Sequence, residues 1–353
     1  MKPVYLAGCG LACTLGLDVL ASVTALRSGG DVTSFYSLPG EPGACFPYRA
    51  IAGVPGDWNE RACELIRRVA LEAGMQHARG GSLFIATSSF DIGAVEQGVA
   101  GMDYNAFADK VAAWLAWVGP VYVVSTACTS SLNAMMAAHA LLQSGEVEDA
   151  LVLGVELNNR LTVGGFAALQ LLSPGRSKPF GAHRDGMVLG EAVAALRLST
   201  RESSLWQMLG GANVVDGKQP TGASASAVEC MYQSALAHCG LAADAIDLIK
   251  VQAAGSPGND AIEAQGLRDM FQAMPPLVSL KATIGHTMGA SGAAEIALLT
   301  ACLESGVWPT YADAVDETLG VHLTAHQPHS VRRVMATILG FGGGHATVVL
   351  VRA

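Results

Sequence analysis

The residue best placed to act as a nucleophile is Cys128, in the stretch VYVVSTACTSSLNAMMAAHALLQ. Residues 121–124 are β-branched or aromatic and predict a buried strand, whereas Leu, Ala and Met from Leu132 onward predict a helix. The small residues 125–131 allow a sharp turn, and the hydroxyls at 129–131 could cap the helix. A thiol at a helix N-terminus is favoured as the nucleophilic thiolate. The alternative is a core cysteine, because free cysteine is among the most buried residue types.

A later stretch, PLVSLKATIGHTMGASGAAEIALLTACLESG, repeats this plan. Each stretch has a strand, a small-residue elbow and an Ala-rich helix, and each helix is closed by Ser-Gly, which is Ser144-Gly145 in the first case. This pattern indicates an internal duplication at low identity. Cys128 and His286 occupy corresponding elbows, so two related halves packed together would bring them to one site. Thr200 to Ser204 is a charged, small-residue break that predicts the boundary between halves: 1–200 with the cysteine elbow, and 201–353 with the histidine loop and a terminal hairpin.

The expected hairpin, residues 334–351, contains LGFGGGH at its turn. Its glycines alone are compatible with a simple hairpin turn. Phe341 among them suggests a loop whose backbone approaches a ligand while one ring controls access.

Strand, helix and strand in succession around Cys128 predict a parallel sheet with right-handed crossovers, and hence an α/β fold.

Composition narrows the class of protein. The chain has 353 residues, 51% of them hydrophobic and 14% charged, which predicts two core-bearing halves and a buried subunit interface. The net charge of −9 disfavours nucleic acid as a partner, and binding an acidic carrier would need a local basic patch such as Arg67–Arg68 or Arg332–Arg333. The longest apolar stretch, near 111–124, is interrupted by Pro120 and is shorter than the roughly 20 residues of a membrane span.

The N-terminal sequence MKPVYLAGCG has no signal-peptide layout, and the eight cysteines lack paired spacing. Both features predict a cytoplasmic protein with reduced thiols. GCGLAC approaches a dinucleotide-binding fingerprint, but Cys13 replaces its third glycine, so an NAD-dependent oxidoreductase is a weak alternative. Residues 29–58 are expected to be loops. We expect no metal or cofactor, because His322, His326 and His329 have no supporting cysteine or carboxylate cluster.

Four segments together resemble the β-ketoacyl-acyl-carrier-protein synthases of the I/II type, in the thiolase superfamily. They are TACTSS, KPFGAHRDGMVLGEAVAAL, SLKATIGHTMGASGAAE and the closing GFGG, in the order in which the family has them. The resemblance covers most of the chain. It implies a thiolase-like fold, a duplicated five-layered α/β/α/β/α arrangement that forms dimers, which agrees with the repeat.

The resemblance assigns roles by position. Cys128 would be the nucleophile that takes an acyl chain from a carrier protein's phosphopantetheine arm. His286 would hydrogen-bond the thioester carbonyl of the second, malonyl substrate and stabilise the enolate. Lys281 and Glu295 match a lysine and a glutamate expected to pair and to hold the histidine loop. The amides of Cys128 and Phe341 would form an oxyanion hole, with Phe341 also controlling access.

One motif of the family is incomplete. The family has H-G-T-x-T-P before an Asp and a Glu, where this chain has VQAAGSPGNDAIE. Pro257, Asp260 and Glu263 anchor the alignment and place Ala253 or Ala254 where the histidine belongs. Alanine has no donor, acceptor or titratable group, so it cannot assist decarboxylation of a malonyl thioester.

Several other residues are candidates to replace this histidine. His139 lies eleven residues after Cys128 on the same predicted helix, roughly 16 Å away and too distant. Gln252 and Asn259 could bind a carbonyl but are poor proton acceptors. His345 follows the glycine turn and is the best substitute, although a histidine that merely begins the last strand is the more ordinary interpretation.

These observations favour a chain-length-factor-like subunit, a degenerate synthase that forms a heterodimer with a complete ketosynthase, as in bacterial aryl-polyene and related type II polyketide systems. The missing histidine supports this hypothesis, while the retained Cys128 argues against complete loss of chemistry. The alternatives are an autonomous β-ketoacyl synthase with an altered site, and a cysteine-dependent acyltransferase or thioester hydrolase. The expected partner in each carrier-dependent case is an acyl-carrier protein bearing acyl and malonyl groups.

Overall fold

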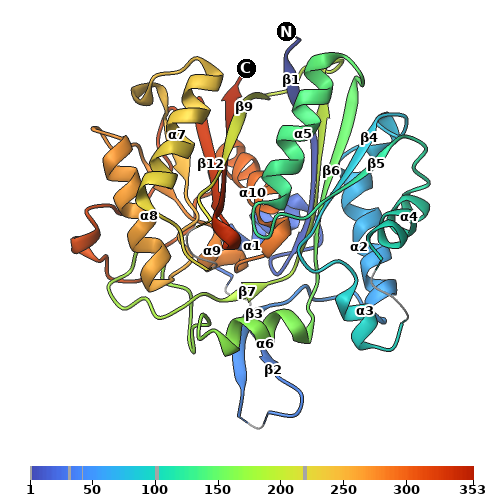
Figure 1. Ribbon diagram of the computed structural model, residues 1–353, viewed down its shortest axis with the longest axis horizontal. Helices are drawn as coiled ribbons and strands as arrows, with labels where there is room; N and C mark the ends of the chain where they lie inside the picture. Colours follow the sequence, from blue (N-terminus) through green and yellow to red (C-terminus); the bar gives the residue numbers. More distant parts are fainter. Residues whose placement is uncertain (1, 31–32, 42, 100–102, 218–220) are drawn as a thin grey trace.

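A computed structural model describes residues 2–30, 33–41, 43–99, 103–217 and 221–353 (Figure 1). Ten strands form one mixed sheet in the order β11-β10-β12-β13-β9-β1-β8-β6-β4-β5. Their bounds are β1 Val4–Cys13, β4 Ser82–Ala86, β5 Val121–Val124, β6 Asp149–Glu156, β8 Ala192–Ser199, β9 Trp206–Val215, β10 Leu248–Lys250, β11 Leu277–Val278, β12 Arg333–Leu339 and β13 Gly344–Arg352.

The duplication predicted from the sequence is present in the topology. From the outer edge inward, the first half has β5, β4, β6, β8 and β1, and the second half has β11, β10, β12, β13 and β9. Pairing is parallel between the three outer strands of each half and antiparallel among the inner strands. The halves join where β1 meets β9, through Val4 with Met208 and Tyr5 with Gln207.

Helices lie between and outside the two halves (Figure 1). The helices are α1 Val19–Arg27, α2 Trp58–Glu72, α3 Ile92–Glu96, α4 Tyr104–Leu115, α5 Ser130–Ser144, α6 Arg160–Ala168, α7 Ala225–Cys239, α8 Pro257–Met270, α9 Lys281–Ile284 and α10 Ser291–Ser305. The elbow helices α5 and α10 contact each other and pack against strands of both halves. Helices α2 and α4 share one outer core, and α7 and α8 share another. This arrangement agrees with the thiolase-like α/β fold.

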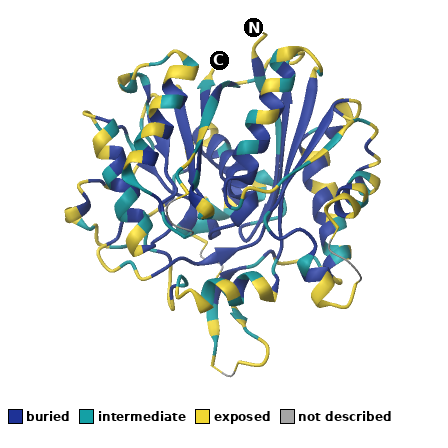
Figure 2. Ribbon diagram, in the orientation of Figure 1, coloured by how far each residue is buried: buried dark blue, intermediate teal, exposed yellow. Residues whose placement is uncertain are grey.

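Burial follows this layering. Figure 2 shows the central strands and α10 as buried, while the outer helices expose one face. Helix α10 is buried along most of its length, including its only charged residue before the last turn, Glu295. A helix that is buried on all sides is typical of a central layer. In the part of the chain that is described, no helix has the length and apolar character needed to cross a bilayer.

The near-match GCGLAC is not a phosphate-binding turn. It lies within β1, and its glycines allow α2 to pack closely. A Cβ on Gly8 would lie 2.2 Å from the carbonyl oxygen of Ala73, and a Cβ on Gly10 would lie 2.0 Å from that of Val69. The glycines therefore serve helix packing, which removes the local basis for the dinucleotide alternative.

The expectation of loops over 29–58 was wrong in part. Among the residues described there, Ser34–Ser37 (β2) and Cys45–Arg49 (β3) form an antiparallel hairpin. Strand β3 also pairs with Leu189–Gly190 (β7), and β2 extends below α6 in Figure 1. Alternating exposed and half-buried side chains along β2 make a weak sequence signal, because little of the segment enters a core.

Candidate active site

The cysteine elbow connects the edge strand β5 to α5. Ala127 has a positive φ of 51°, which turns the chain sharply before Cys128. The predicted capping hydroxyls do not cap the helix with their side chains: Thr129 is the N-cap residue but accepts no helix amide. Instead the Ser130 hydroxyl accepts a hydrogen bond from the Thr126 amide at 2.9 Å and donates to the Ala127 carbonyl at 2.6 Å. These bonds hold the turn rigid, and Cys128 is only 4% exposed.

The two elbows meet as the duplication predicted. Nε2 of His286 lies 3.0 Å from Sγ of Cys128, although 158 residues separate them. His286 follows α9 and Gly285, whose φ of 76° reverses the chain direction. Its amide donates to the carbonyl of Val188 at 2.7 Å, which ties the histidine loop to the first half.

Lys281 and Glu295 pair with each other next to His286. Nζ of Lys281 lies 3.0 Å from Nδ1 of His286 and 3.0 Å from Oγ of Ser291, and it forms an ion pair with Glu295. A lysine ammonium has donors only, so Nδ1 accepts and the proton of a neutral imidazole is on Nε2, facing Cys128. Burial, followed by the charges of Lys281 and Lys250, holds the pKa of His286 well below its usual value. His286 is therefore a neutral hydrogen-bond donor.

Lys250 is a site residue that was not predicted from the sequence. It ends β10 and is 1% exposed, with Nζ 2.6 Å from Oε2 of Glu295 and 2.6 Å from the carbonyl oxygen of Thr337. One carboxylate thus contacts two ammonium groups. The available signal was a lysine inside the apolar run LIKV, because charged side chains are seldom fully buried without a partner.

The amide of Cys128 near the helix N-terminus favours the thiolate, as the sequence predicts, but burial outweighs this effect. Burial raises the pKa of this thiol to about 11, and the charge of Lys281 and the amides of Phe341 and Cys128 only partly oppose that effect. The thiol is therefore the resting form at neutral pH. The same two amides, which favour negative charge on the sulfur, are those proposed for the oxyanion hole.

The cavity beside Cys128 distinguishes between the two neighbouring alanines, Ala253 and Ala254. The space open to water is about 10 Å³, enough for about one molecule. Ala254 lines the cavity and Ala253 does not. The other lining residues are Cys128, Met187, Gln252, Ser256, Asn259, Asp260, Glu263, His286, Leu339 and Phe341.

Two carboxylates hold the loop that carries Ala254. Glu263 accepts the amides of Gln252 and Ala253, each at 2.7 Å, and Asp260 accepts three successive amides beginning at Ala254. Burial raises the pKa of Asp260 to about 6 and that of Glu263 to about 7. Their oxygens are occupied by backbone amides, so these side chains shape the loop.

Phe341 covers the cavity. It begins the short 3-10 helix Phe341–Gly343 and stacks on Phe166 of α6, with ring centroids 5.3 Å apart and planes at 18°. Gly342 and Gly343 have φ of 80° and 77°, a conformation that favours glycine. The loop thus presents an amide and a ring at the site, in agreement with the position expected from the sequence.

The proposed replacement histidines lie elsewhere. His345 is buried on β13, does not line the cavity, and has its Nε2 4.0 Å from Oδ2 of Asp216. His139 is buried on α5 and is likewise absent from the cavity lining. Across the described ranges, no group of histidine, cysteine and carboxylate side chains is arranged to hold a metal ion, so His322, His326 and His329 form no such site.

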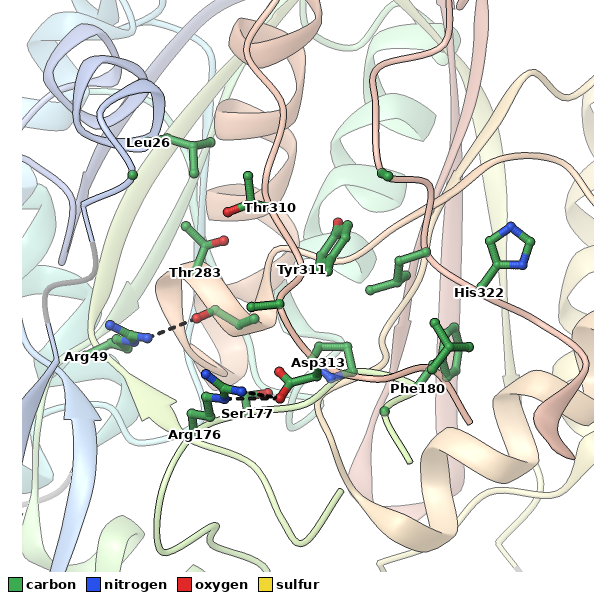
Figure 3. Close-up of a pocket in the computed structure, with 18 of the residues that line it drawn as sticks. Leu26, Arg49, Arg176, Ser177, Phe180, Thr283, Thr310, Tyr311, Asp313 and His322 are labelled. Atoms are coloured by element: carbon green, nitrogen blue, oxygen red, sulfur yellow. Dashed lines mark hydrogen bonds and ion pairs between the residues drawn. The ribbon is translucent and has the colours of Figure 1, made fainter. Parts of the chain in front are cut away.

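A larger cleft, about 330 Å³, lies beside α9 but outside this site (Figure 3). Ala282 and Thr283 line it, whereas the preceding residue, Lys281, contacts His286. Arg176 and Asp313 form an ion pair at its rim. None of the site residues predicted from the sequence lines this cleft.

Comparison with known proteins identifies the family. Residues 68–204 match the family model for the β-ketoacyl synthase N-terminal domain, and residues 208–314 match that for the C-terminal domain. The phenolphthiocerol synthesis polyketide synthase type I Pks15/1 of Mycobacterium marinum is 32% identical over 69% of this chain and 13% of its own length. The putative polyketide β-ketoacyl synthase 1 of Streptomyces cyaneus is 30% identical over 66% of this chain and 60% of its own length.

Solved structures share the fold over the whole chain. The ketosynthase ApeO in complex with its chain length factor ApeC, from Xenorhabdus doucetiae, matches with a TM-score of 0.84 at 24% identity, over 100% of this chain and 98% of that chain. The ishigamide ketosynthase/chain length factor matches with a TM-score of 0.88 at 21% identity, over 100% and 99%. This chain spans about a tenth of the length of the first curated relatives it matches. With both domain models matched in order and the two elbows in contact, the chain belongs to the β-ketoacyl synthase family.

Proposed function

We propose that this chain is a chain-length-factor-like partner of a complete ketosynthase in polyketide or fatty-acid-type elongation, with Cys128 able to take an acyl group and with decarboxylation impaired. The observation that carries the proposal is Ala254 in the wall of the cavity that contains Cys128 and His286. Its methyl group can neither donate nor accept a hydrogen bond. The site therefore retains the groups for acyl transfer and lacks the second imidazole of the family.

Acyl transfer follows from the geometry around Cys128. Its sulfur, as the thiolate, attacks the thioester carbon of an acyl group on an acyl-carrier protein, and the C–S bond to the phosphopantetheine arm then breaks. The amides of Cys128 and Phe341 would stabilise the oxyanion of the tetrahedral intermediate. The proton lost from Cys128 leaves on the released phosphopantetheine thiol. The ring of Phe341 must move from Phe166 to admit the substrate.

Decarboxylation of a malonyl thioester places negative charge on the thioester oxygen as the enolate forms. His286 offers one donor, Nε2–H, to that oxygen. Ala254 offers none, and removal of one donor of this kind typically lowers a rate by about 10² to 10³. A partner with an intact site would supply the missing chemistry.

The edge strand β5 supports the assignment of a dimer. It is the last strand of the sheet and is only half-buried, with Tyr122 42% exposed although the strand is apolar. An unpaired, apolar edge favours pairing with a strand of another subunit. Because this strand leads directly to Cys128, the same contact would place a partner next to the site. We favour a heterodimer because this subunit alone lacks the second imidazole.

An acyl-carrier protein is the proposed donor. Arg67 and Arg68 are exposed on α2, although Arg68 also pairs with Glu64 at 3.2 Å. Arg332 is exposed near the end of the chain and Arg333 is partly exposed. These two pairs are the candidate contacts for an acidic carrier on a chain with net charge −9.

The contact between Cys128 and His286 also favours a second candidate, a cysteine-dependent acyltransferase or thioester hydrolase, which needs no decarboxylation.

Incubation with acyl-carrier protein, with and without a complete ketosynthase, distinguishes these functions by mass spectrometry. We expect an acyl adduct on Cys128 that is absent in Cys128→Ala and present in Cys302→Ala, a second buried thiol. Efficient CO2 release from malonyl-carrier protein by the isolated chain would contradict the partner-subunit proposal and indicate an autonomous synthase. Absence of any adduct would exclude acyl transfer through Cys128.

A further inference from the structure

The feature that the proposed chemistry does not use is the second buried lysine, Lys250. Its ammonium contacts Glu295, whose other oxygen contacts Lys281, and Lys281 contacts His286. His286 in turn contacts Cys128. Five side chains, all 4% exposed or less, thus form a continuous series from β10 to the nucleophile.

The positive and negative charges in this series do not cancel. Lys250 and Lys281 contribute two positive charges, Glu295 contributes one negative charge, and His286 is neutral. A buried cluster with one excess positive charge is costly in a medium of low dielectric constant. Conversion of Cys128 to its thiolate adds one negative charge a few side chains away and brings the total to zero.

Other titratable groups face the series from the neighbouring elements. Glu263 of α8 acts on Lys250 through its charge, and Asp260 lies in the same cavity as Cys128. Glu156 of β6 acts on Cys128 and raises the pKa of the thiol. Glu156 therefore opposes formation of the thiolate. The positive charge of Lys250 would offset this negative charge.

We propose that Lys250 is a positioning residue for the nucleophile: through Glu295 it orients Lys281 and His286, and its charge stabilises the thiolate of Cys128. Lys250 also fixes Glu295 mechanically, because its second contact is the carbonyl of Thr337 on β12. This inference rests on the proposed use of Cys128 as the acyl acceptor, and it names a group that controls the reactivity of that residue.

The test is the rate of alkylation of Cys128 by iodoacetamide between pH 7 and 9.5, read from the Cys128 peptide by mass spectrometry. In this range the rate is proportional to the thiolate fraction, because the pKa of the thiol is about 11. We expect Lys250→Met to slow alkylation about tenfold at each pH, which corresponds to a rise of about one unit in the thiol pKa.

Three further variants separate charge from structure. Lys250→Gln keeps a hydrogen-bond donor without the charge, and we expect it to be slowed as much as Lys250→Met. Lys250→Arg keeps the charge and should restore most of the rate. Thr337→Val, beside the same carbonyl, removes a buried hydroxyl that bonds Thr347 at 2.9 Å and should leave the rate unchanged.

Wild-type alkylation rates in both Lys250→Met and Lys250→Gln would overturn the inference. A wild-type rate in Lys250→Gln alone would also overturn it, because it would show that the charge of Lys250 does not stabilise the thiolate. Thermal unfolding of each variant identifies any that fail to fold. If only one of the Gln and Met variants folds, its alkylation rate alone is compared with that of the wild type. Failure of the proposed acyl transfer can be told apart from failure of this inference, because alkylation of Cys128 needs no carrier protein. An unacylated wild-type protein whose alkylation still depends on Lys250 would refute acyl transfer and support this inference.

Discussion

Nε2 of His286 lies 3.0 Å from Sγ of Cys128, and Lys281 contacts Nδ1 on the opposite side of the ring. Because Nδ1 accepts a hydrogen bond from Lys281, the proton of the neutral ring is on Nε2. A histidine in this state donates a hydrogen bond and is a poor base. We therefore infer that His286 stabilises negative charge, on the sulfur or on a substrate oxygen.

His286→Ala should reduce the rate of acyl transfer to Cys128 by about 10², because the donor 3.0 Å from Sγ that stabilises the thiolate is lost. His286→Asn, which can present an amide donor, should recover part of the rate. Mass-spectrometric time courses of the adduct measure both. His139→Ala removes a buried histidine outside the cavity and should leave the rate unchanged; an equal loss in that variant would mean that the effect is one of folding.

Ala254→His should increase CO2 release from malonyl-carrier protein by about tenfold or more, because it returns a donor to the cavity. The water-accessible space of about 10 Å³ means that neighbouring side chains must move to admit the ring. Ala253→His, whose side chain would point away from the cavity, is the matched control. An Ala254→His protein that folds and releases no more CO2 than the wild type would show that the deficit has another origin.

Removal of the Phe341 ring should expose the nucleophile. In Phe341→Ala we expect alkylation of Cys128 by a bulky maleimide to be several-fold faster, because the ring that covers the cavity is absent. Phe166→Ala removes only the stacking partner and should give a smaller increase. Equal rates in Phe341→Ala and the wild type would mean that substrates reach Cys128 by another route.

The pH dependence of stability should report on Glu263. Burial raises its pKa to about 7, so the protonated form stabilises the folded chain below about pH 4.5, and this contribution is lost as the pH rises through 7. The loss is about 3 kcal/mol for a shift of this size. Urea unfolding at pH 5 and pH 7.5 should show a smaller decrease for Glu263→Gln than for the wild type, with exposed Glu64→Gln behaving as the wild type. If the free energy of unfolding fell between pH 5 and pH 7.5 by the same amount in Glu263→Gln as in the wild type, the assignment to Glu263 would be wrong.

The packing of β1 on α2 gives a stability prediction. Gly10→Ala should lower the free energy of unfolding by roughly 2–4 kcal/mol, because the new methyl group meets the Val69 carbonyl oxygen. Gly80→Ala, whose new Cβ would have no atom within 4 Å, should change it by less than about 0.5 kcal/mol. Chemical denaturation measures both; a neutral Gly10→Ala would mean that α2 can move away from the strand.

The sequence was sufficient to predict the duplicated α/β fold and the contact between the two elbows, because strand and helix periodicity is strong around Cys128 and His286. It also located Lys281 and Glu295 by their place in a family motif. It did not predict the raised pKa of Cys128, which depends on burial by segments distant in the chain. Lys250 was missed for the same reason, since its partners Glu295 and Thr337 lie 45 and 87 residues away. The choice between Ala253 and Ala254 required the direction of each side chain.

Strand β5 ends the sheet, and among the strands that the structure describes its one neighbour is β4. A free strand edge is a template for any other extended chain. If this protein is made without a partner that covers β5, we expect it to aggregate, and co-expression with that partner should raise the yield of dispersed protein. The yield of dispersed protein during purification would then show whether the chain needs a partner subunit, before its chemistry is assayed.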